Sequence, residues 1–335
     1  MQRIITENKK RIEWLDVARG LSIFFVIFGH SGVGYTWIMQ YAIPLFHLAM
    51  FFFVSGYLFK ENCSFGVVFE QRTRTLLFPY LFWGTFAVFI GHILGNPPIS
   101  IIDDFKGVLL LYGDYLRIWF IGALWAYSLF FYIITRMCKS NCIALGGWTL
   151  LLFVLGCLYL HHWNGPKLPY CMDKSFCAMA FMCLGLLYKK KEYLIDSFLS
   201  KKIVIFAFVV FVCAVNLFNN CREYFGCAEI YPSLLIYGLG IPIAIFIAKH
   251  WTKYNRAILF LGKNSMMFFV FHFQIGTIVG KIFGMINKDL LLFSPMISTT
   301  IKTIVIVLLT TIPVLFVNRF CPFLKGQGFK LFNRL

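Results

Sequence analysis

The sequence predicts an all-α, polytopic integral membrane protein with about ten transmembrane helices and both termini in the cytoplasm. Three observations support this fold class: the composition, the length of the apolar runs, and the distribution of basic residues between them. Hydrophobic residues make up 60% of the chain, aromatic residues 19% and charged residues only 13%. Soluble domains are about 45–50% apolar and about 25% charged, so this composition excludes a soluble globular protein.

Apolar runs long enough to cross a bilayer, or nearly so, recur along the whole chain. A helix needs about 20 consecutive apolar residues to cross the hydrocarbon core. The sixth run is the shortest of the set. We expect one transmembrane helix in each run, at residues 15–34, 42–59, 76–95, 117–135, 143–161, 175–188, 203–219, 230–248, 257–280 and 298–317.

The basic residues between the runs predict the orientation, because Lys and Arg accumulate in cytoplasmic loops. With the N-terminus in the cytoplasm, the segments on that side are rich in Lys and Arg, as residues 189–202 illustrate. The net charge of +17 is therefore explained by the basic cytoplasmic segments and does not indicate a nucleic-acid partner. The opposite segments hold only a few basic residues, which are Lys106, Arg117, Lys167, Lys174, Arg222, Lys281 and Lys288.

We expect residues 1–335 to form a single membrane-embedded domain with no fused soluble domain. The first apolar run contains charged residues and lacks a small-residue cleavage site, so it is predicted to be a span rather than a signal peptide. The 11 cysteines form no CxxC pair, and we expect no metal site. Cys221 and Cys227 share a predicted outside loop, where a disulfide stays an open alternative.

The first apolar run carries three ionisable residues, Asp16, Arg19 and His30. On a helix, Arg19 and His30 differ by only about 20° in direction, and Asp16 lies one turn before Arg19 on the same face. His30 is then about 16 Å deeper in the bilayer than Arg19. In one interpretation these residues only mark the two membrane boundaries. In the other they line a cavity, which is where ionisable groups inside membranes usually lie.

Several segments resemble the acyltransferase 3 family of membrane O-acyltransferases, and their order and spacing agree over nearly the whole chain. The segment RIEWLDVARGLSIFFVIFGH at residues 11–30 is similar to the first-helix signature of this family. Within the family, the chain is most similar to the fucose 4-O-acetylase-like branch. The further matching segments are FHLAMFFFVSGYLF at 46–59, RTRTLLFPYLFWG at 72–84, IWFIGALW at 118–125, LPYCMDKSFCAMAFMCLG at 168–185 and LGKNSMMFFVFHF at 261–273.

The resemblance implies transfer of an acyl group, expected to be acetyl, from cytoplasmic acetyl-CoA to a hydroxyl group. The acceptor would be a carbohydrate or a lipid-linked glycan, and the enzyme would be a multi-pass protein of the cell membrane. An imidazole suits a general base near neutral pH because its ordinary pKa is about 6.5. The candidate catalytic residues are His30, Asp16 and His272. Whether His30 takes the acceptor proton directly or carries the acyl group covalently stays open, as does whether His272 lines the same cavity.

Coenzyme A carries a pyrophosphate and a ribose phosphate, which arginine side chains bind well. Arg19, Arg72 and Arg74 are the candidates for this role. For Arg72 and Arg74 the alternative is that they only mark a cytoplasmic loop. We interpret the Ser55–Gly56 pair as a site of close helix packing rather than as a nucleophile.

A transporter is the main alternative function, and it would use His30 and His272 as a proton relay. Against it, the two halves of the chain show no convincing internal repeat. Binding of acyl-CoA separates the two functions, because a transporter gains no thermal stability from CoA.

Overall fold

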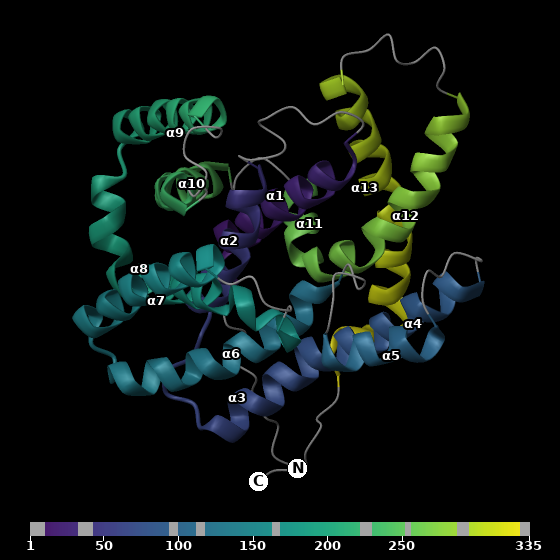
Figure 1. The fold of residues 1–335 in the computed structure, drawn as a ribbon, viewed down its shortest axis with the longest axis horizontal. Helices are drawn as coiled ribbons and strands as arrows, with labels where there is room; N and C mark the ends of the chain where they lie inside the picture. Colours follow the sequence, from purple (N-terminus) through teal and green to yellow (C-terminus); the bar gives the residue numbers. More distant parts are fainter. Residues whose placement is uncertain are drawn as a thin grey trace.

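The computed structural model describes residues 11–32, 43–93, 100–111, 118–162, 168–221, 230–251, 256–286 and 295–328. Within these ranges every regular element is a helix and there is no strand (Figure 1). The α-helices are α1 (Glu13–His30), α2 (Ile43–Tyr57), α3 (Phe65–Arg72), α4 (Phe78–Ile93), α5 (Ile101–Leu110), α6 (Trp119–Cys138), α7 (Cys142–His162), α8 (Ser175–Phe198), α9 (Lys201–Cys221), α10 (Ile230–Trp251), α11 (Arg256–Lys263), α12 (Ser265–Ile286) and α13 (Pro295–Phe320). Three shorter elements are the π-helix η2 (Thr73–Leu77) and the 3₁₀ helices η3 (Pro169–Lys174) and η5 (Pro322–Lys325).

Each of the ten predicted runs overlaps a helix. In the described part of the chain, six helical segments are long and apolar enough to cross a membrane, and two further apolar helices, His47–Tyr57 and Leu239–Trp251, are shorter. The all-helical, multi-pass class is therefore confirmed, whereas ten spans and cytoplasmic termini stay predictions. The six segments are Phe65–Ile93, Trp119–Cys138, Cys142–Tyr159, Pro169–Phe198, Ser265–Met285 and Met296–Phe320.

Two helices differ from the predicted runs. The run at 175–188 continues as α8 to Phe198, with a kink at Lys191 (φ −120°, ψ 19°), so the basic residues that follow it are helical rather than in a loop. Lys190 there pairs with Glu61 at 2.6 Å. The run at 257–280 is divided at Asn264, whose side-chain amide donates to the carbonyl of Phe260 at 2.9 Å and so competes with the helix.

The predicted outside loop after the third run contains the helix α5. Ser100 caps it by accepting a hydrogen bond from the Asp103 amide at 3.2 Å, and acidic residues in the first turn favour a helix N-terminus. A hydrogen bond from the Ser100 hydroxyl and the charge of Lys106 lower the pKa of Asp103. His92 of α4 and Asp104 approach to 2.8 Å and connect the two helices. The alternative of a disulfide between Cys221 and Cys227 stays open, because Cys227 lies outside the described residues.

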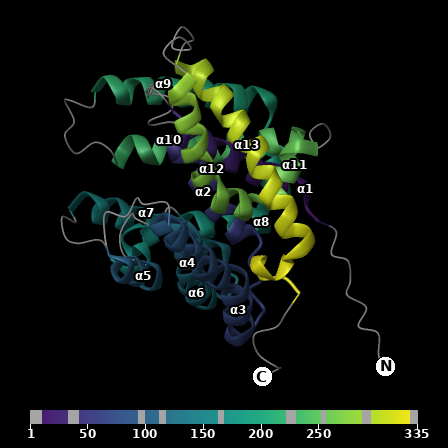
Figure 2. The same cartoon turned by 90° about the vertical axis from the view of Figure 1, so that its right-hand side faces the viewer.

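Helix α1 occupies the interior of the bundle. It contacts α2, α10, α11, α12 and α13, and Figures 1 and 2 show these helices around it. Leu15, Val17, Ile23 and Ile27 are at most 1% exposed. A helix with apolar residues on most of its circumference is buried by its neighbours, and Asp16 of this helix is buried with them.

Glycines allow two pairs of helices to approach very closely. A Cβ atom on Gly262 of α11 would lie 1.7 Å from the carbonyl oxygen of Asp16, and one on Gly20 would lie 2.2 Å from the carbonyl oxygen of Ile258. In the α2–α8 pair, a Cβ on Gly56 would lie 1.9 Å from the carbonyl oxygen of Met182. The predicted packing role of the glycine at 56 is therefore confirmed.

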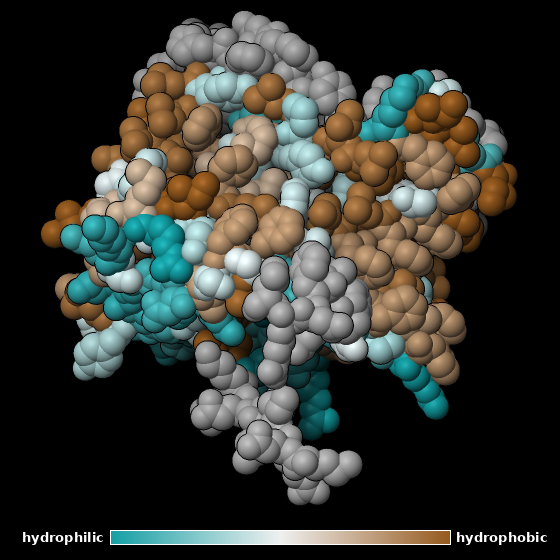
Figure 3. Space-filling view, turned by 90° about the horizontal axis from the view of Figure 1, so that it is seen from below, coloured by the Kyte–Doolittle hydropathy of each residue, from teal (hydrophilic) through white to brown (hydrophobic). Residues whose placement is uncertain are grey.

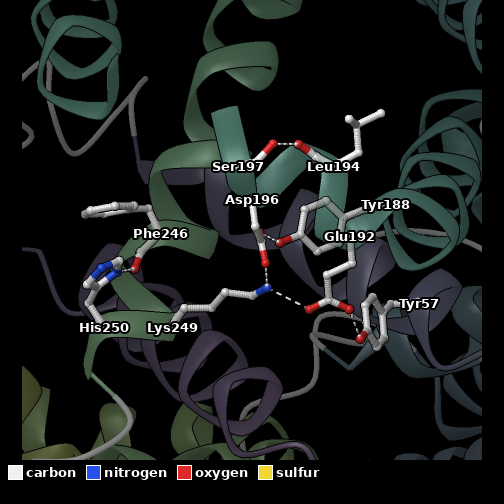
Figure 4. Close-up of polar contacts among 9 residues, drawn as sticks. All are labelled: Tyr57, Tyr188, Glu192, Leu194, Asp196, Ser197, Phe246, Lys249 and His250. Carbon is white, nitrogen blue, oxygen red and sulfur yellow. Dashed lines mark hydrogen bonds and ion pairs between the residues drawn. The ribbon is translucent and has the colours of Figure 1, made fainter. Parts of the chain in front are cut away.

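A polar cluster joins α2, α8 and α10. Glu192 and Asp196 lie one turn apart on α8, and Lys249 of α10 donates to both carboxylates, at 2.6 Å and 2.5 Å (Figure 4). The hydroxyl groups of Tyr57 and Tyr188 donate to the other oxygens of Glu192 and Asp196. Two like charges at this spacing repel each other, so the ammonium group between them stabilises the helix junction.

Apolar side chains cover much of the outer surface. Figure 3 shows broad apolar areas on the face seen from below, with hydrophilic residues gathered toward one side. A soluble monomer rarely exposes continuous apolar surface on this scale, and a lipid-facing surface does so by necessity. Exposed examples from four helices are Ile143, Leu150, Phe206, Ile278, Leu308 and Ile312.

We expect Gly262→Ala to lower the melting temperature of the purified protein in detergent. The added methyl group overlaps the backbone of Asp16, and overpacking of this kind costs about 1–3 kcal/mol. Gly146→Ala is the matched control, because a Cβ on Gly146 of α7 meets nothing within 4 Å. Equal melting of the Gly262→Ala variant and the wild type would show that α1 and α11 are not packed through this contact.

Candidate functional site

Two cavities lie inside the bundle. The first, which we call the arginine cavity, has a volume of about 240 Å³. The second, the histidine cavity, has a volume of about 130 Å³. The arginine cavity is lined by Arg19, Phe51, Val54, Ser55, Leu58, Arg72, Leu76, Phe120, Ile121, Leu124, Ser265, Met266 and Phe269. The histidine cavity is lined by Ile27, His30, Ser31, His272, Phe273, Gly276, Thr277 and Ile306.

Asp16 and Arg19 form the ion pair that their spacing predicts. The guanidinium Nη2 of Arg19 lies 3.0 Å from Oδ1 of Asp16, whose side chain is fully buried. Arg11 also pairs with Asp16, a partner that the helical spacing did not indicate. A buried carboxylate is costly unless it is paired, so the two arginines stabilise it. Asp16 lines neither cavity, and its contacts assign it to the positioning of Arg19.

Arg72 is the second cation of the arginine cavity. It ends α3, and its guanidinium carbon lies 5.9 Å from the centre of the Phe59 ring. Among the described residues, no carboxylate pairs with Arg72. The carboxylate that pairs with Arg19, that of Asp16, also pairs with Arg11. The arginine cavity therefore carries uncompensated positive charge and is suited to an anion.

Arg74 does not line the arginine cavity. It lies in η2, and its guanidinium Nη1 donates to the carbonyl oxygen of Gly326 at 2.6 Å. Gly326 has φ 73°, and a Cβ there would lie 2.1 Å from the carbonyl oxygen of Arg74. The structure thus places Arg72 at the cavity and Arg74 against the C-terminal 3₁₀ helix.

The π-helix η2 begins directly after Arg72 and contains Arg74. Pro79 follows it, and a proline clashes with the carbonyl four residues earlier, here that of Thr75. A wider π turn accommodates such a residue, and π-bulges are frequent at functional sites. The hydroxyl of Thr73 accepts a hydrogen bond from Trp125 at 3.1 Å, which fixes η2 against α6.

The structure brings His30 and His272 together. Their ring centres are 5.4 Å apart, although they come from α1 and α12. His30 is exposed at the end of α1, whereas His272 is 2% exposed. The ring of Phe273 lies beside both, at 4.5 Å from His30 and 4.3 Å from His272. The sequence left open whether the two histidines share a cavity, and the structure places both in the histidine cavity.

Hydrogen bonds to the backbone define the neutral form of each imidazole. Nδ1 of His30 is 2.7 Å from the carbonyl oxygen of Val26. Nδ1 of His272 is 2.8 Å from the carbonyl oxygen of Phe269. A carbonyl oxygen only accepts hydrogen bonds, so Nδ1 carries the proton in both rings and Nε2 is the basic nitrogen. Such a nitrogen is suited to take a proton from a hydroxyl group.

The two cavities follow the same two helices. On α1, Arg19 lines the first cavity and His30 the second, about 16 Å further along the axis. On α12, Ser265 lines the first cavity and His272 the second, about 10 Å further along. α1 and α12 therefore run in the same direction, from the arginine cavity to the histidine cavity. The helix face on which the sequence places Arg19 and His30 therefore borders both the arginine cavity and the histidine cavity.

The sequence analysis interpreted one residue of the arginine cavity, Ser55, as a packing residue and did not identify another, Ser265. Ser55 lines the arginine cavity, although its neighbour Gly56 is the packing residue. Ser265 is seven residues before His272, which puts the two on one helical face, and that spacing is the signal that would have identified it. No group of three or more His, Cys, Asp or Glu side chains in the described ranges is arranged to hold a metal ion.

Comparison with known proteins identifies the family. Residues 12–317 match the family described as an acyltransferase domain. No curated protein and no solved structure matches the chain. The match does not distinguish between branches of the family, so the fucose 4-O-acetylase-like branch stays a prediction. Because the match covers nearly the whole chain, this multi-pass membrane protein belongs to the acyltransferase 3 family and is an acyltransferase.

Proposed function

We propose that the protein transfers an acetyl group from cytoplasmic acetyl-CoA to a hydroxyl group of a carbohydrate or lipid-linked glycan. The observation that carries this proposal is the pair of cavities on α1 and α12, one with two arginines and one with two histidines. The first supplies charge for an anionic donor, and the second supplies a base for a hydroxyl acceptor.

The phosphates of coenzyme A bind to Arg19 and Arg72 in this proposal. Guanidinium groups bind phosphates through paired, charge-assisted hydrogen bonds. The remaining walls of the arginine cavity are mostly apolar and suit the pantetheine arm, which runs toward the histidines. Ser55 and Ser265 offer hydroxyl groups for the amides of that arm.

His30 acts on the acceptor. In the direct route, the acceptor oxygen attacks the thioester carbon while Nε2 of His30 takes the hydroxyl proton, the C–S bond breaks, and the proton passes to the thiolate of CoA. In the relay route, Nε2 attacks the thioester carbon, the C–S bond breaks and CoA leaves as the thiolate. The hydroxyl then attacks the acyl carbon, the C–N bond breaks to restore the neutral imidazole, and the hydroxyl proton passes to the thiolate. Both routes use the same nitrogen. The small histidine cavity admits the reacting hydroxyl and its neighbouring atoms rather than a whole glycan.

Acetyl-CoA is a cytoplasmic donor, so we place the Arg19 end of α1 at the cytoplasmic surface of the cell membrane. With ten spans, both termini lie on that side. Reporter fusions after Arg74 and Lys191 are then expected to be cytoplasmic, and fusions near Asp104 and Lys288 external. An external reporter at Lys191 would contradict the ten-span topology.

Arg72→Ala is expected to raise the Kd for CoA about tenfold to a hundredfold, since a hydrogen bond to a charged group contributes about 1.5–3 kcal/mol. The measurement is titration of the purified protein in detergent, with melting curves as a check on folding. Arg136→Ala is the matched control, because Arg136 donates to the carbonyl of Cys63 outside the cavity.

Unchanged CoA affinity in a folded Arg72→Ala protein would remove Arg72 from the donor site. A wild-type protein that gains no thermal stability from CoA would instead favour the transporter function. Arg74→Ala tests the remaining sequence prediction. Because Arg74 bonds to Gly326, we expect this variant to lose stability rather than CoA affinity.

His30→Ala is expected to lower transfer of radiolabelled acetyl groups into native membranes about a hundredfold to ten-thousandfold, the usual effect of losing a general base. CoA affinity should stay close to that of the wild type. His272→Ala is the comparison variant at similar depth. We expect it to lose less acetyl-transfer activity than His30→Ala. Ordinary turnover in His30→Ala together with inactivity of His272→Ala would assign the base to α12 instead.

A further inference from the structure

The arginine and histidine cavities are separated by two neighbouring rings of α12, those of Phe269 and His272. Phe269 of α12 lines the arginine cavity. Its ring centre is 5.7 Å from that of His272, which lines the histidine cavity. Phe269 is 7% exposed and His272 is 2% exposed, so the two rings fill the space between the cavities.

Two further aromatic residues support Phe269. The ring of Phe120 on α6 is 5.7 Å from Phe269, and the ring of Phe51 on α2 is 5.5 Å from Phe120. All three line the arginine cavity, and we call them the aromatic wall. Ser265 lines the same cavity about 6 Å earlier along α12. The aromatic wall therefore closes the cavity on the side of the histidines.

We propose that Phe269 limits the length of the acyl chain that the enzyme accepts from its donor. The inference rests on the proposed function, because it assumes that acyl-CoA binds with its phosphates at Arg19 and Arg72. The acyl end of the donor then meets the ring of Phe269 on its way to His272. An acetyl group is short enough to lie against this ring, and each added methylene group competes with the ring for the same space.

A smaller side chain at this position extends the arginine cavity toward the ring of His272 and provides space for a longer chain. Each methylene group that becomes buried there increases the affinity by about fourfold. For a hexanoyl chain, with four methylene groups more than acetyl, we expect a gain of at least tenfold relative to acetyl-CoA. Free CoA has no acyl chain and gains nothing from the added space, so its Kd in each variant is the reference for the change that depends on the acyl chain.

Phe273 provides the matched control. It is one turn further along α12, and its ring centre is 4.3 Å from that of His272, closer than the 5.7 Å of Phe269. It lines the histidine cavity and not the arginine cavity. Truncation of Phe273 therefore removes a similar ring without enlarging the donor cavity. Phe269→Leu is a second test variant, because it removes less volume and tests the proposal should Phe269→Ala not fold.

The experiment measures the Kd values of CoA, acetyl-CoA, butanoyl-CoA and hexanoyl-CoA by competition with labelled CoA. It uses the full-length wild type, Phe269→Ala, Phe269→Leu and Phe273→Ala in detergent. We expect the wild type to prefer acetyl-CoA, Phe269→Ala to shift the ratio toward hexanoyl-CoA by at least tenfold, and Phe269→Leu to lie between them. Phe273→Ala should keep the wild-type ratio.

An unchanged ratio in a folded Phe269→Ala or Phe269→Leu protein that still binds CoA overturns this inference and leaves the proposed function intact. An equal shift in Phe273→Ala overturns it as well, since the effect would not be specific to the wall. A wild type that binds none of the four probes contradicts the proposed function, and this inference with it.

Discussion

The ion pair between Asp16 and Arg19 is the interaction on which the rest of the site depends. The side chain of Asp16 is fully buried between helices, where an unpaired carboxylate would cost several kcal/mol. Arg19 and Arg11 compensate it, and this contact holds the Arg19 guanidinium at the arginine cavity. The backbone of Asp16 is also the surface on which Gly262 packs, so the same turn of α1 fixes the position of α11. Because α12 begins two residues after α11 ends, this contact also determines where α12 starts.

From this contact, α1 and α12 run side by side, and the ring centres of His30 and His272 lie 5.4 Å apart. The acetyl donor and the hydroxyl acceptor in our proposal differ in charge, size and side of approach, and two small cavities accommodate them better than one large cleft. In this proposal the acyl group of the donor meets the aromatic wall at Phe269, the ring of the wall that lies next to His272. The polar cluster around Lys249 stabilises the other side of α2, away from this route.

Helical periodicity predicted much of this arrangement within single helices and little of it between helices. The ten apolar runs, the Asp16–Arg19 pair and the common face of Arg19 and His30 follow from spacing alone. The meeting of His30 and His272 depends on tertiary packing through Gly20, Gly262 and the break at Asn264, which no single-helix pattern contains. The sequence also grouped Arg72 with Arg74. The π turn η2 and the contact with Gly326 send the two side chains to different places. Pro79 is a local signal for the π turn, whereas the contact with Gly326 has none in the local pattern.

The most direct test of this account is a structure of the protein bound to a non-hydrolysable acetyl-CoA analogue, in which a methylene group separates the sulfur from the carbonyl carbon. The account predicts that the phosphates contact Arg19 and Arg72, and that the acetyl end lies at Phe269 and points toward His30 and His272. Phosphates bound away from both arginines, or an acetyl group that ends in a part of the bundle remote from the two histidines, would contradict it.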